Sequence, residues 1–238
     1  MPSPLAPVRR ARKITKATRK PAPKTWPPQP SRVAAILREL DRLYPAADCE
    51  LNRKNPFQLL CATILSAQCT DERVNRVTPD LFARFPTPAA MAKAPPAVLE
   101  DIIRTTGFFR NKAKNLIGAA RLLDEKWGGE IPRTMKALLE LPGVARKTAN
   151  VVLGTAFGIT EGVVVDTHVT RLSQRLGLTR EATAEHIERD LMEIVPRQCW
   201  ILFAHQIIWH GRRVCHARKP DCDACSLVPH CPSAFSEV

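Results

Sequence analysis

The sequence lacks any apolar run approaching the roughly 20 residues that a helix needs to cross a bilayer. It also lacks the apolar stretch of a secretory signal at its N-terminus. Strand-like runs are nearly absent: only residues 163 to 165, Val-Val-Val, look extended, and that run is too short for a sheet. These absences exclude membrane-spanning and β-rich classes. They favour a soluble, intracellular protein whose 238 residues can bury one or two cores without a disulfide framework.

Residues 1 to 32 contain no acidic residue and carry nine Lys and Arg. The whole chain has a net charge of +13, so the remaining residues have a net charge of +4. Such a balance attracts polyanions, of which nucleic acid is the commonest in a cell. Residues 1 to 30 also hold eight of the 21 prolines. We predict that they form a disordered basic arm. Its charge is compatible with DNA affinity, with solubility alone, or with targeting to an organelle.

From Ser31 onward, apolar residues recur at helical spacing. Ser31 is predicted to cap the first helix, which Pro45 ends, and Asn55-Pro56 to open a buried helix over residues 57 to 68. Further helices are predicted over residues 71–85, 95–106, 111–127, 134–140, 146–157, 167–176, 184–195 and 200–210. The predicted fold class is all-α.

Residues 138 to 153 read Leu-Leu-Glu-Leu-Pro-Gly-Val-Ala-Arg-Lys-Thr-Ala-Asn-Val-Val-Leu, which predicts a helix, a tight turn at Gly143 and a second helix. The start of that second helix presents N–H groups and partial positive charge that suit a phosphate, although a plain connector would read the same. Lys147 changes the balance, because partial burial in the first turn would favour its neutral, nucleophilic amine. Nineteen residues later, Asp166 begins another helix, as an N-cap, a catalytic carboxylate or both.

The eight cysteines fall into two groups. Four are scattered among apolar neighbours, as expected of small core residues in a reducing compartment: Cys49, Cys61, Cys69 and Cys199. The others form a C-x6-C-x2-C-x5-C ligand set: Cys215, Cys222, Cys225 and Cys231. Four thiolates suit structural zinc or an iron–sulfur cluster, and a disulfide pair is a weaker third choice.

The hairpin segment, followed by Val-Asp-Thr-His at residues 165 to 168, resembles the helix-hairpin-helix and Gly/Pro-Asp signature of the endonuclease III family. The likeness runs from about residue 31 to the end and includes Ile-Leu-Ser-Ala-Gln at 64–68, Gly-Phe-Phe-Arg-Asn-Lys-Ala at 107–113 and the terminal cysteines. It implies two helical lobes with a cleft between them. Residues 49–159 would form a six-helix barrel containing the hairpin, and residues 31–48 with 160–238 would form a cluster domain.

By this resemblance the chain would be a bifunctional DNA glycosylase and AP lyase of base excision repair. It would act as a monomer on duplex DNA that carries an oxidised pyrimidine or an abasic site, in the cytoplasm with the nucleoid of a bacterium. Lys147 would attack C1′ of a flipped nucleotide and form a Schiff base, while an ionised Asp166 stabilises positive charge on the sugar. The resemblance also implies a [4Fe–4S] cluster on the four C-terminal cysteines.

The same resemblance assigns DNA contacts. Gln68 would fill the gap left by the flipped base, and Phe108 stands where a Leu usually wedges the opposite strand. The plainer interpretation is a buried Gln at a helix end and a core Phe. Phosphate contacts are expected from the hairpin and from cations around the cysteines: Gly143, Ala145, Arg146, Arg212, Arg213, Arg218 and Lys219.

Ala145 departs from the Gly-Val-Gly hairpin usual in the family. If the position needs positive φ, alanine costs roughly 1 to 2 kcal/mol. If it needs only close phosphate approach, the methyl group lengthens a contact, so we expect weaker DNA binding than usual.

Two other functions fit parts of the sequence. An adenine glycosylase of the same superfamily would need an acid within residues 56–70, where there is none, and would lack the hairpin lysine. A cluster-containing DNA-binding regulator would not need Lys147 and Asp166 together.

Overall fold

The computed structural model describes residues 26–236, which contain helices, turns and loops and no strand. This confirms the predicted all-α fold class. The chain divides into two compact units, one of Asp48–Val164 and one that joins Met1–Ala47 to Val165–Val238. Within the described range, no helix is both long and apolar enough to span a membrane.

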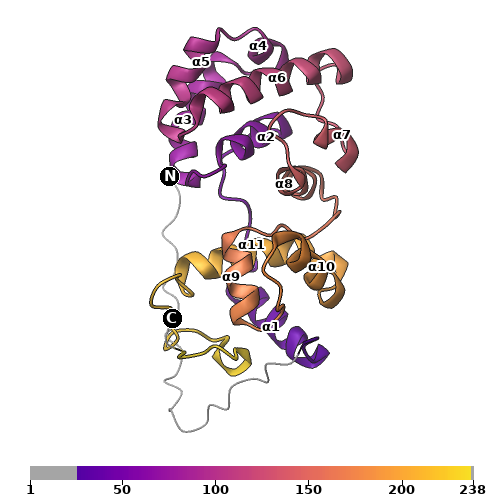
Figure 1. Cartoon of the computed structure of the whole chain (residues 1–238), viewed down its shortest axis with the longest axis vertical. Coiled ribbons are helices and arrows are strands. Elements are labelled where there is room, and N and C mark those ends of the chain that lie inside the picture. Colours follow the sequence, from indigo (N-terminus) through magenta and orange to yellow (C-terminus); the bar gives the residue numbers. More distant parts are fainter. Residues whose placement is uncertain (1–25, 237–238) are drawn as a thin grey trace. The chain divides into compact units, whose positions relative to one another are not determined.

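The Asp48–Val164 unit is built around α2. Its helices are α2 (Pro56–Leu65), α3 (Asp71–Arg84), α4 (Pro88–Ala92), α5 (Pro96–Ile103), η2 (Arg104–Thr106), α6 (Phe109–Trp127), α7 (Met135–Leu139) and α8 (Arg146–Phe157). α2 packs against α3, α6 and α8, and α6 packs against α4 and α5 (Figure 1). Eight of the ten α2 residues are buried, as its apolar sequence predicts for a central helix.

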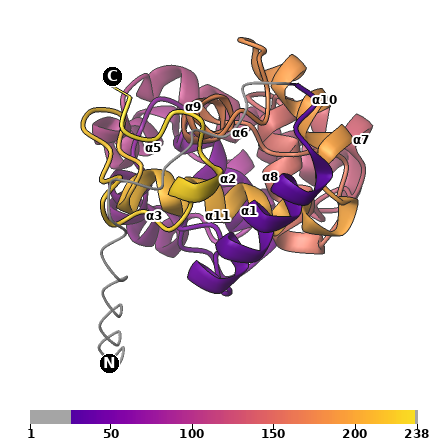
Figure 2. The same ribbon diagram turned by 90° about the horizontal axis from the view of Figure 1, so that it is seen from below.

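The other unit joins the two ends of the chain. It contains α1 (Pro30–Leu43), α9 (Thr167–Arg175), α10 (Ala184–Ile194), η3 (Arg197–Cys199), α11 (Trp200–Arg213) and η4 (Val228–His230). α1 packs against α11, as Figure 2 shows, and α9 packs against α10 and α11. The buried Arg32 fastens α1 by donating to the carbonyls of Leu176, Gly177 and His230 at 2.6, 2.9 and 3.0 Å.

Several local predictions need correction. Gln29, not Ser31, is the N-cap of α1, because Pro30 already takes the first helical position, which its fixed φ suits. α2 ends at Leu65 and not at residue 68. The short helix α4, which Thr87 caps through the amide of Ala90, was not predicted from the sequence.

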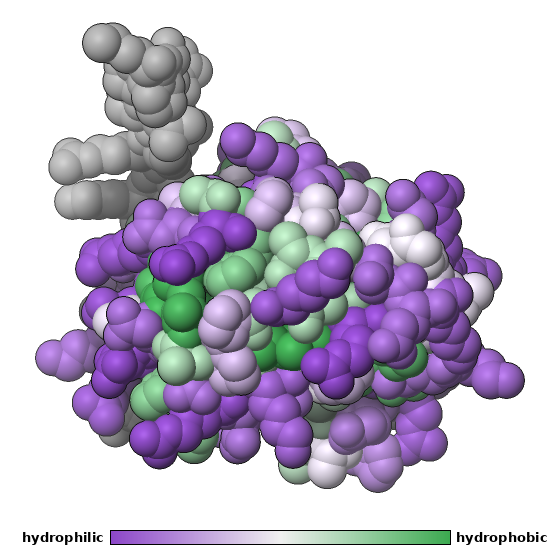
Figure 3. Space-filling view, turned by 90° about the horizontal axis from the view of Figure 1, so that it is seen from above, coloured by the Kyte–Doolittle hydropathy of each residue, from purple (hydrophilic) through white to green (hydrophobic). Residues whose placement is uncertain are grey.

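The predicted basic arm lies mostly outside the described residues, since these begin at Trp26. Trp26 itself is packed: its Nε1 donates to the carbonyl of Leu178 at 3.0 Å. The arm as predicted, to residue 30, therefore extends too far. The face in Figure 3 is covered mainly by hydrophilic side chains with smaller hydrophobic areas between them, which is ordinary for a surface in contact with water.

Candidate functional site

The hairpin between α7 and α8 depends on two buried side chains and one glycine. Leu141 and Val144 are buried, and the amide of Val144 donates to the carbonyl of Leu141 at 3.1 Å. Gly143 has φ +79°, and a Cβ there would lie 2.8 to 3.0 Å from the side chain of Asn115 on α6. The left-handed backbone and the close contact both require glycine.

Ala145 is the N-cap of α8, with φ −95° and ψ 172° and no capping bond from its side chain. The expectation that alanine strains a position with positive φ is wrong, because any residue adopts this extended backbone. One reason for weaker DNA binding remains: the methyl group of alanine keeps a phosphate farther from the backbone than a glycine would. Arg146 follows as an exposed residue, and its guanidinium lies 3.5 Å from the carbonyl oxygen of Glu161.

Lys147 is the second residue of α8, and its side chain is exposed. The partial burial that would favour a neutral amine is therefore not seen. Helical geometry explains the difference: the buried face of α8 carries Ala149, Val152 and Leu153, and a residue two positions before Ala149 falls on the opposite side. The residue lies in the first turn of α8, at the positive end of the helix dipole.

Asp166 caps α9. Its Oδ1 accepts hydrogen bonds from the amides of His168 and Val169, both at 2.8 Å. The side chain is half-buried, and its orientation is fixed by these two bonds. Both bonds end on Oδ1, so capping by itself does not use Oδ2.

Gln68 and Phe108 share a left-handed backbone and an exposed side chain. Both have left-handed backbones, with φ of 51° and 46°, and both are exposed. Phe108 is 66% exposed, which is high for a large apolar side chain. The plainer interpretation, a buried Gln and a core Phe, is therefore wrong. Positive φ in a bulky residue is uncommon, and such strain concentrates at functional sites.

The cations predicted near the cysteines differ in exposure. Arg213, Arg218 and Lys219 are exposed, and Arg212 is half-buried. The guanidinium of Arg213 lies 3.9 Å from the ring centroid of Trp209, a cation–π contact that orients it. These side chains give the cysteine loop a basic surface suited to a polyanion.

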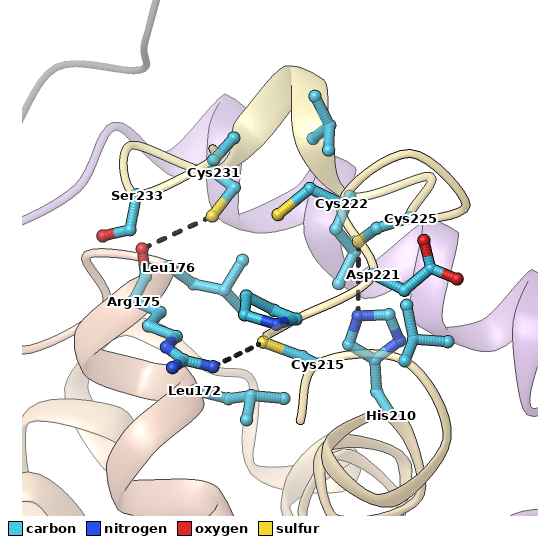
Figure 4. Close-up of a pocket in the computed structure, with 15 residues that line it drawn as sticks. Leu172, Arg175, Leu176, His210, Cys215, Asp221, Cys222, Cys225, Cys231 and Ser233 are labelled. Atoms are coloured by element: carbon cyan, nitrogen blue, oxygen red, sulfur yellow. Dashed lines mark hydrogen bonds between the residues drawn. The ribbon is translucent and has the colours of Figure 1, made fainter. Parts of the chain in front are cut away.

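The four C-terminal cysteines line one cavity, together with His210 and Arg175 (Figure 4). It has about 460 Å³ of atom-free space, part of it open to solvent. Among residues 26–236, no three His, Cys, Asp or Glu side chains lie close enough to hold one metal ion. Cys49, Cys61, Cys69 and Cys199 lie outside the cavity, and of these only Cys61 is fully buried.

Burial disfavours negative charge on two of the thiols in this cavity. Burial, reinforced by the neighbouring thiols, raises the pKa of Cys225 to about 12 and that of Cys231 to about 11. Thiolates in such a place need bound positive charge, which metal ions supply. The donor set, four cysteines that line one cavity, therefore fits an iron–sulfur cluster.

Two buried side chains, Tyr44 and His210, form a hydrogen-bonded chain that reaches the cavity. This chain was not predicted from the sequence. His210 Nδ1 lies 3.0 Å from the Tyr44 hydroxyl, and Nε2 lies 3.4 Å from Cys225 Sγ. Burial lowers the pKa of His210 to about 4 and raises that of Tyr44 to about 12, so both are neutral. A neutral His210 that accepts from Tyr44 carries its proton on Nε2, from which it can donate to the sulfur.

Two arginines of α9 also contact the cysteine loop without having been predicted to do so. Arg171 donates to the carbonyl of Cys215 at 3.0 Å. Arg175 donates to the carbonyl of His216 at 2.7 Å, and its guanidinium lies 3.3 Å from Cys215 Sγ (Figure 4). Arg171 and Arg175 have i, i+4 spacing, which puts both on one face of the helix that begins after Asp166. This spacing was the signal from which a shared contact could have been predicted.

Comparison with known proteins gives consistent results. The model of the HhH-GPD superfamily of base excision DNA repair proteins matches residues 61–197. Endonuclease III of Synechocystis is 59% identical over 85% of this chain and 93% of its own length, and that of Bacillus subtilis is 43% identical over 82% and 89%.

Among solved structures, a trapped covalent endonuclease III–DNA intermediate superposes with a TM-score of 0.82 at 42% identity, covering 87% of this chain and 97% of that one. The hairpin, the helical fold and these similarities agree. The chain belongs to the endonuclease III family of the HhH-GPD superfamily, and it is a DNA glycosylase of base excision repair.

Proposed function

We propose that the chain is a bifunctional enzyme that removes an oxidised pyrimidine from duplex DNA and then cuts the strand as an AP lyase. The observation that carries the proposal is Lys147, an exposed amine in the first turn of α8, directly after a hairpin suited to phosphate. A relative 42% identical to this chain forms a covalent intermediate with DNA, which supports a nucleophile on the protein.

Lys147 would attack C1′ of the flipped nucleotide, so that a C–N bond to lysine forms while the glycosidic C–N bond breaks and the base leaves with a proton. Opening of the sugar gives an imine, the Schiff base. Removal of a C2′ proton then expels the 3′ phosphate, and water releases the lysine.

Asp166 would act as the fixed negative charge. The sugar carries partial positive charge as the base departs, and a carboxylate oriented in advance stabilises that charge. Its two cap bonds supply the orientation and leave Oδ2 for the sugar.

Gln68 and Phe108 would hold the duplex open. An exposed aromatic ring can enter between base pairs, and an exposed amide can take the place of the extruded base. Gly143, Ala145 and Arg146 would bind backbone phosphates at the hairpin. Further phosphates would meet the cations beside the cysteines: Arg212, Arg213, Arg218 and Lys219.

The cofactor of this proposal is a [4Fe–4S] cluster held by Cys215, Cys222, Cys225 and Cys231, because the four thiols line one cavity and the chain belongs to the endonuclease III family. When bound, it would supply metal–thiolate bonds that fold a loop with few apolar side chains. Iron and acid-labile sulfide in equal amounts, about four of each per chain, would support this. One zinc per chain would contradict it.

Borohydride trapping tests the nucleophile. The holo-protein is incubated with a duplex containing one abasic site and reduced, which converts an imine into a stable amine. We expect a covalent adduct that Lys147→Ala loses completely. The matched control is Lys136→Ala, an exposed lysine on α7 of the same hairpin, which should retain it. An adduct of normal yield in Lys147→Ala would refute the assignment.

Substrate class needs its own measurement. Duplexes with a single thymine glycol, or with 8-oxoguanine at the same position, are compared by the rate of base release. We expect faster release of the oxidised pyrimidine. A preference for the oxidised purine would overturn that part of the proposal.

A further inference from the structure

Lys112, on α6, is a buried cation that the proposed chemistry does not use. Only 4% of the residue is exposed, and its Nζ donates to the carbonyls of Leu65 at 2.9 Å and Thr106 at 2.7 Å. Burial lowers the pKa of Lys112, with the nearby Cys69 opposing. A lysine is seldom buried this deeply unless its ammonium has partners of this kind.

The two carbonyls are the last of their helices. Leu65 ends α2 and Thr106 ends η2, so each carbonyl lacks an intrahelical partner and accepts from the ammonium instead. One side chain therefore closes two helix ends that are 41 residues apart in sequence.

Each of these helix ends is followed, within three residues, by an exposed residue with a left-handed backbone. Gln68 comes three residues after Leu65, and Phe108 comes two residues after Thr106. Both have φ near +50°. The backbone amide of Lys112 also donates to the carbonyl of Phe108 at 3.1 Å, so this residue holds the Phe108 turn from two directions.

We infer that Lys112 is a positioning residue that sets the Gln68 turn and the Phe108 turn in register, so that both side chains enter the duplex at the same lesion. The inference rests on the proposed function. Left-handed backbone in residues with a Cβ is unfavourable and relaxes unless its surroundings hold it. The ammonium of Lys112 joins the two turns, because it binds the carbonyl that precedes each of them. Without the ammonium, each turn could relax independently of the other.

The test uses full-length holo-protein and two duplexes, one undamaged and one with a tetrahydrofuran abasic analogue opposite 2-aminopurine. The probe's fluorescence rises when it loses stacking. Lys112→Met keeps the apolar stem and removes the ammonium, and Lys112→Arg keeps the charge. For Lys112→Met we expect affinity for the abasic-analogue duplex to fall about tenfold, with a smaller fluorescence rise and unchanged affinity for undamaged DNA. Lys112→Arg should restore part of both signals.

A purely structural role gives another result. Lys112→Met would then lower the unfolding midpoint, while the ratio of affinities for the two duplexes and the fluorescence rise of the bound complex stay as in the wild type. That outcome overturns the inference.

A second measurement does not depend on whether Lys112 variants fold. In the wild-type background, Gln68→Ala, Phe108→Ala and the double variant form a cycle on the abasic-analogue duplex. The inference requires coupling of about threefold or more between the two sites, and additive effects would contradict it. The wild-type borohydride adduct is measured in parallel: without it the proposed function fails, whereas an adduct together with additive effects removes only the role of Lys112.

Discussion

Replacement of Ala145 by serine should change stability and DNA affinity in opposite directions. Ala145 is the N-cap of α8, its backbone is extended, and its side chain makes no capping bond. A serine there would place Oγ to accept from the amide of Lys147 or Thr148, the second and third helical residues. The site is exposed, so the hydroxyl has room.

The magnitude follows from the cap. Serine in place of alanine at an N-cap is worth about 1 kcal/mol, within a range of about 0.5 to 2. For a chain of this size, that raises the unfolding midpoint by about 2 to 4 °C. If a DNA phosphate binds the same amides, the cap bond must break on binding. Affinity then falls by the same free energy, or about fivefold.

Two measurements on the holo-protein test this: the thermal unfolding midpoint, and fluorescence anisotropy with an abasic-analogue duplex at one fixed salt concentration. Ala145→Gly is the control, since it removes the methyl group without adding an acceptor, and it should bind more tightly than the wild type. A serine variant that is more stable and binds DNA undiminished would refute phosphate binding at these amides.

Three further predictions concern separate parts of the chain. Asp166→Asn keeps an N-cap acceptor and removes the charge, so the rate of base release should fall at least tenfold with little change in the unfolding midpoint. Asp166→Ala also removes the cap, so it should in addition lose about 1 kcal/mol of stability. Phe108→Gly relieves a left-handed backbone and should stabilise the free protein by about 1 kcal/mol in urea unfolding, yet weaken binding to the abasic-analogue duplex. Burial raises the pKa of Tyr44 to about 12, above its ordinary value near 10. Its stabilising effect is therefore complete below pH 10 and lost between about pH 10 and 12, so the wild-type unfolding midpoint should fall more steeply across that window than that of Tyr44→Phe.

Much of the fold could be predicted from local patterns. Asn55-Pro56 predicts the start of α2, and the cap is present, with Asn55 accepting from the amide of Gln58. Helix ends were less predictable. α2 ends at Leu65 and not at Gln68, and its last carbonyl accepts from Lys112, a partner far along the chain that the local sequence does not reveal.

The candidate site divides in the same way. Cysteine spacing and the hairpin sequence were enough to single out the residues on which the proposed function rests. Neither could predict that the backbone at Ala145 is unstrained or that Lys147 is exposed, because both depend on how α8 packs against its neighbours. Phe108 illustrates the limit most clearly, since an aromatic residue in an apolar sequence is ordinarily buried.

The sequence by itself determined most of the helices, the hairpin glycine and the spacing of the four C-terminal cysteines, because periodicity, turn chemistry and residue spacing act over a few neighbouring residues. Only the tertiary structure decided which side chains face water and which groups meet. Burial and strain arise from contacts between distant segments, such as the one that joins Lys112 to a carbonyl 47 residues away.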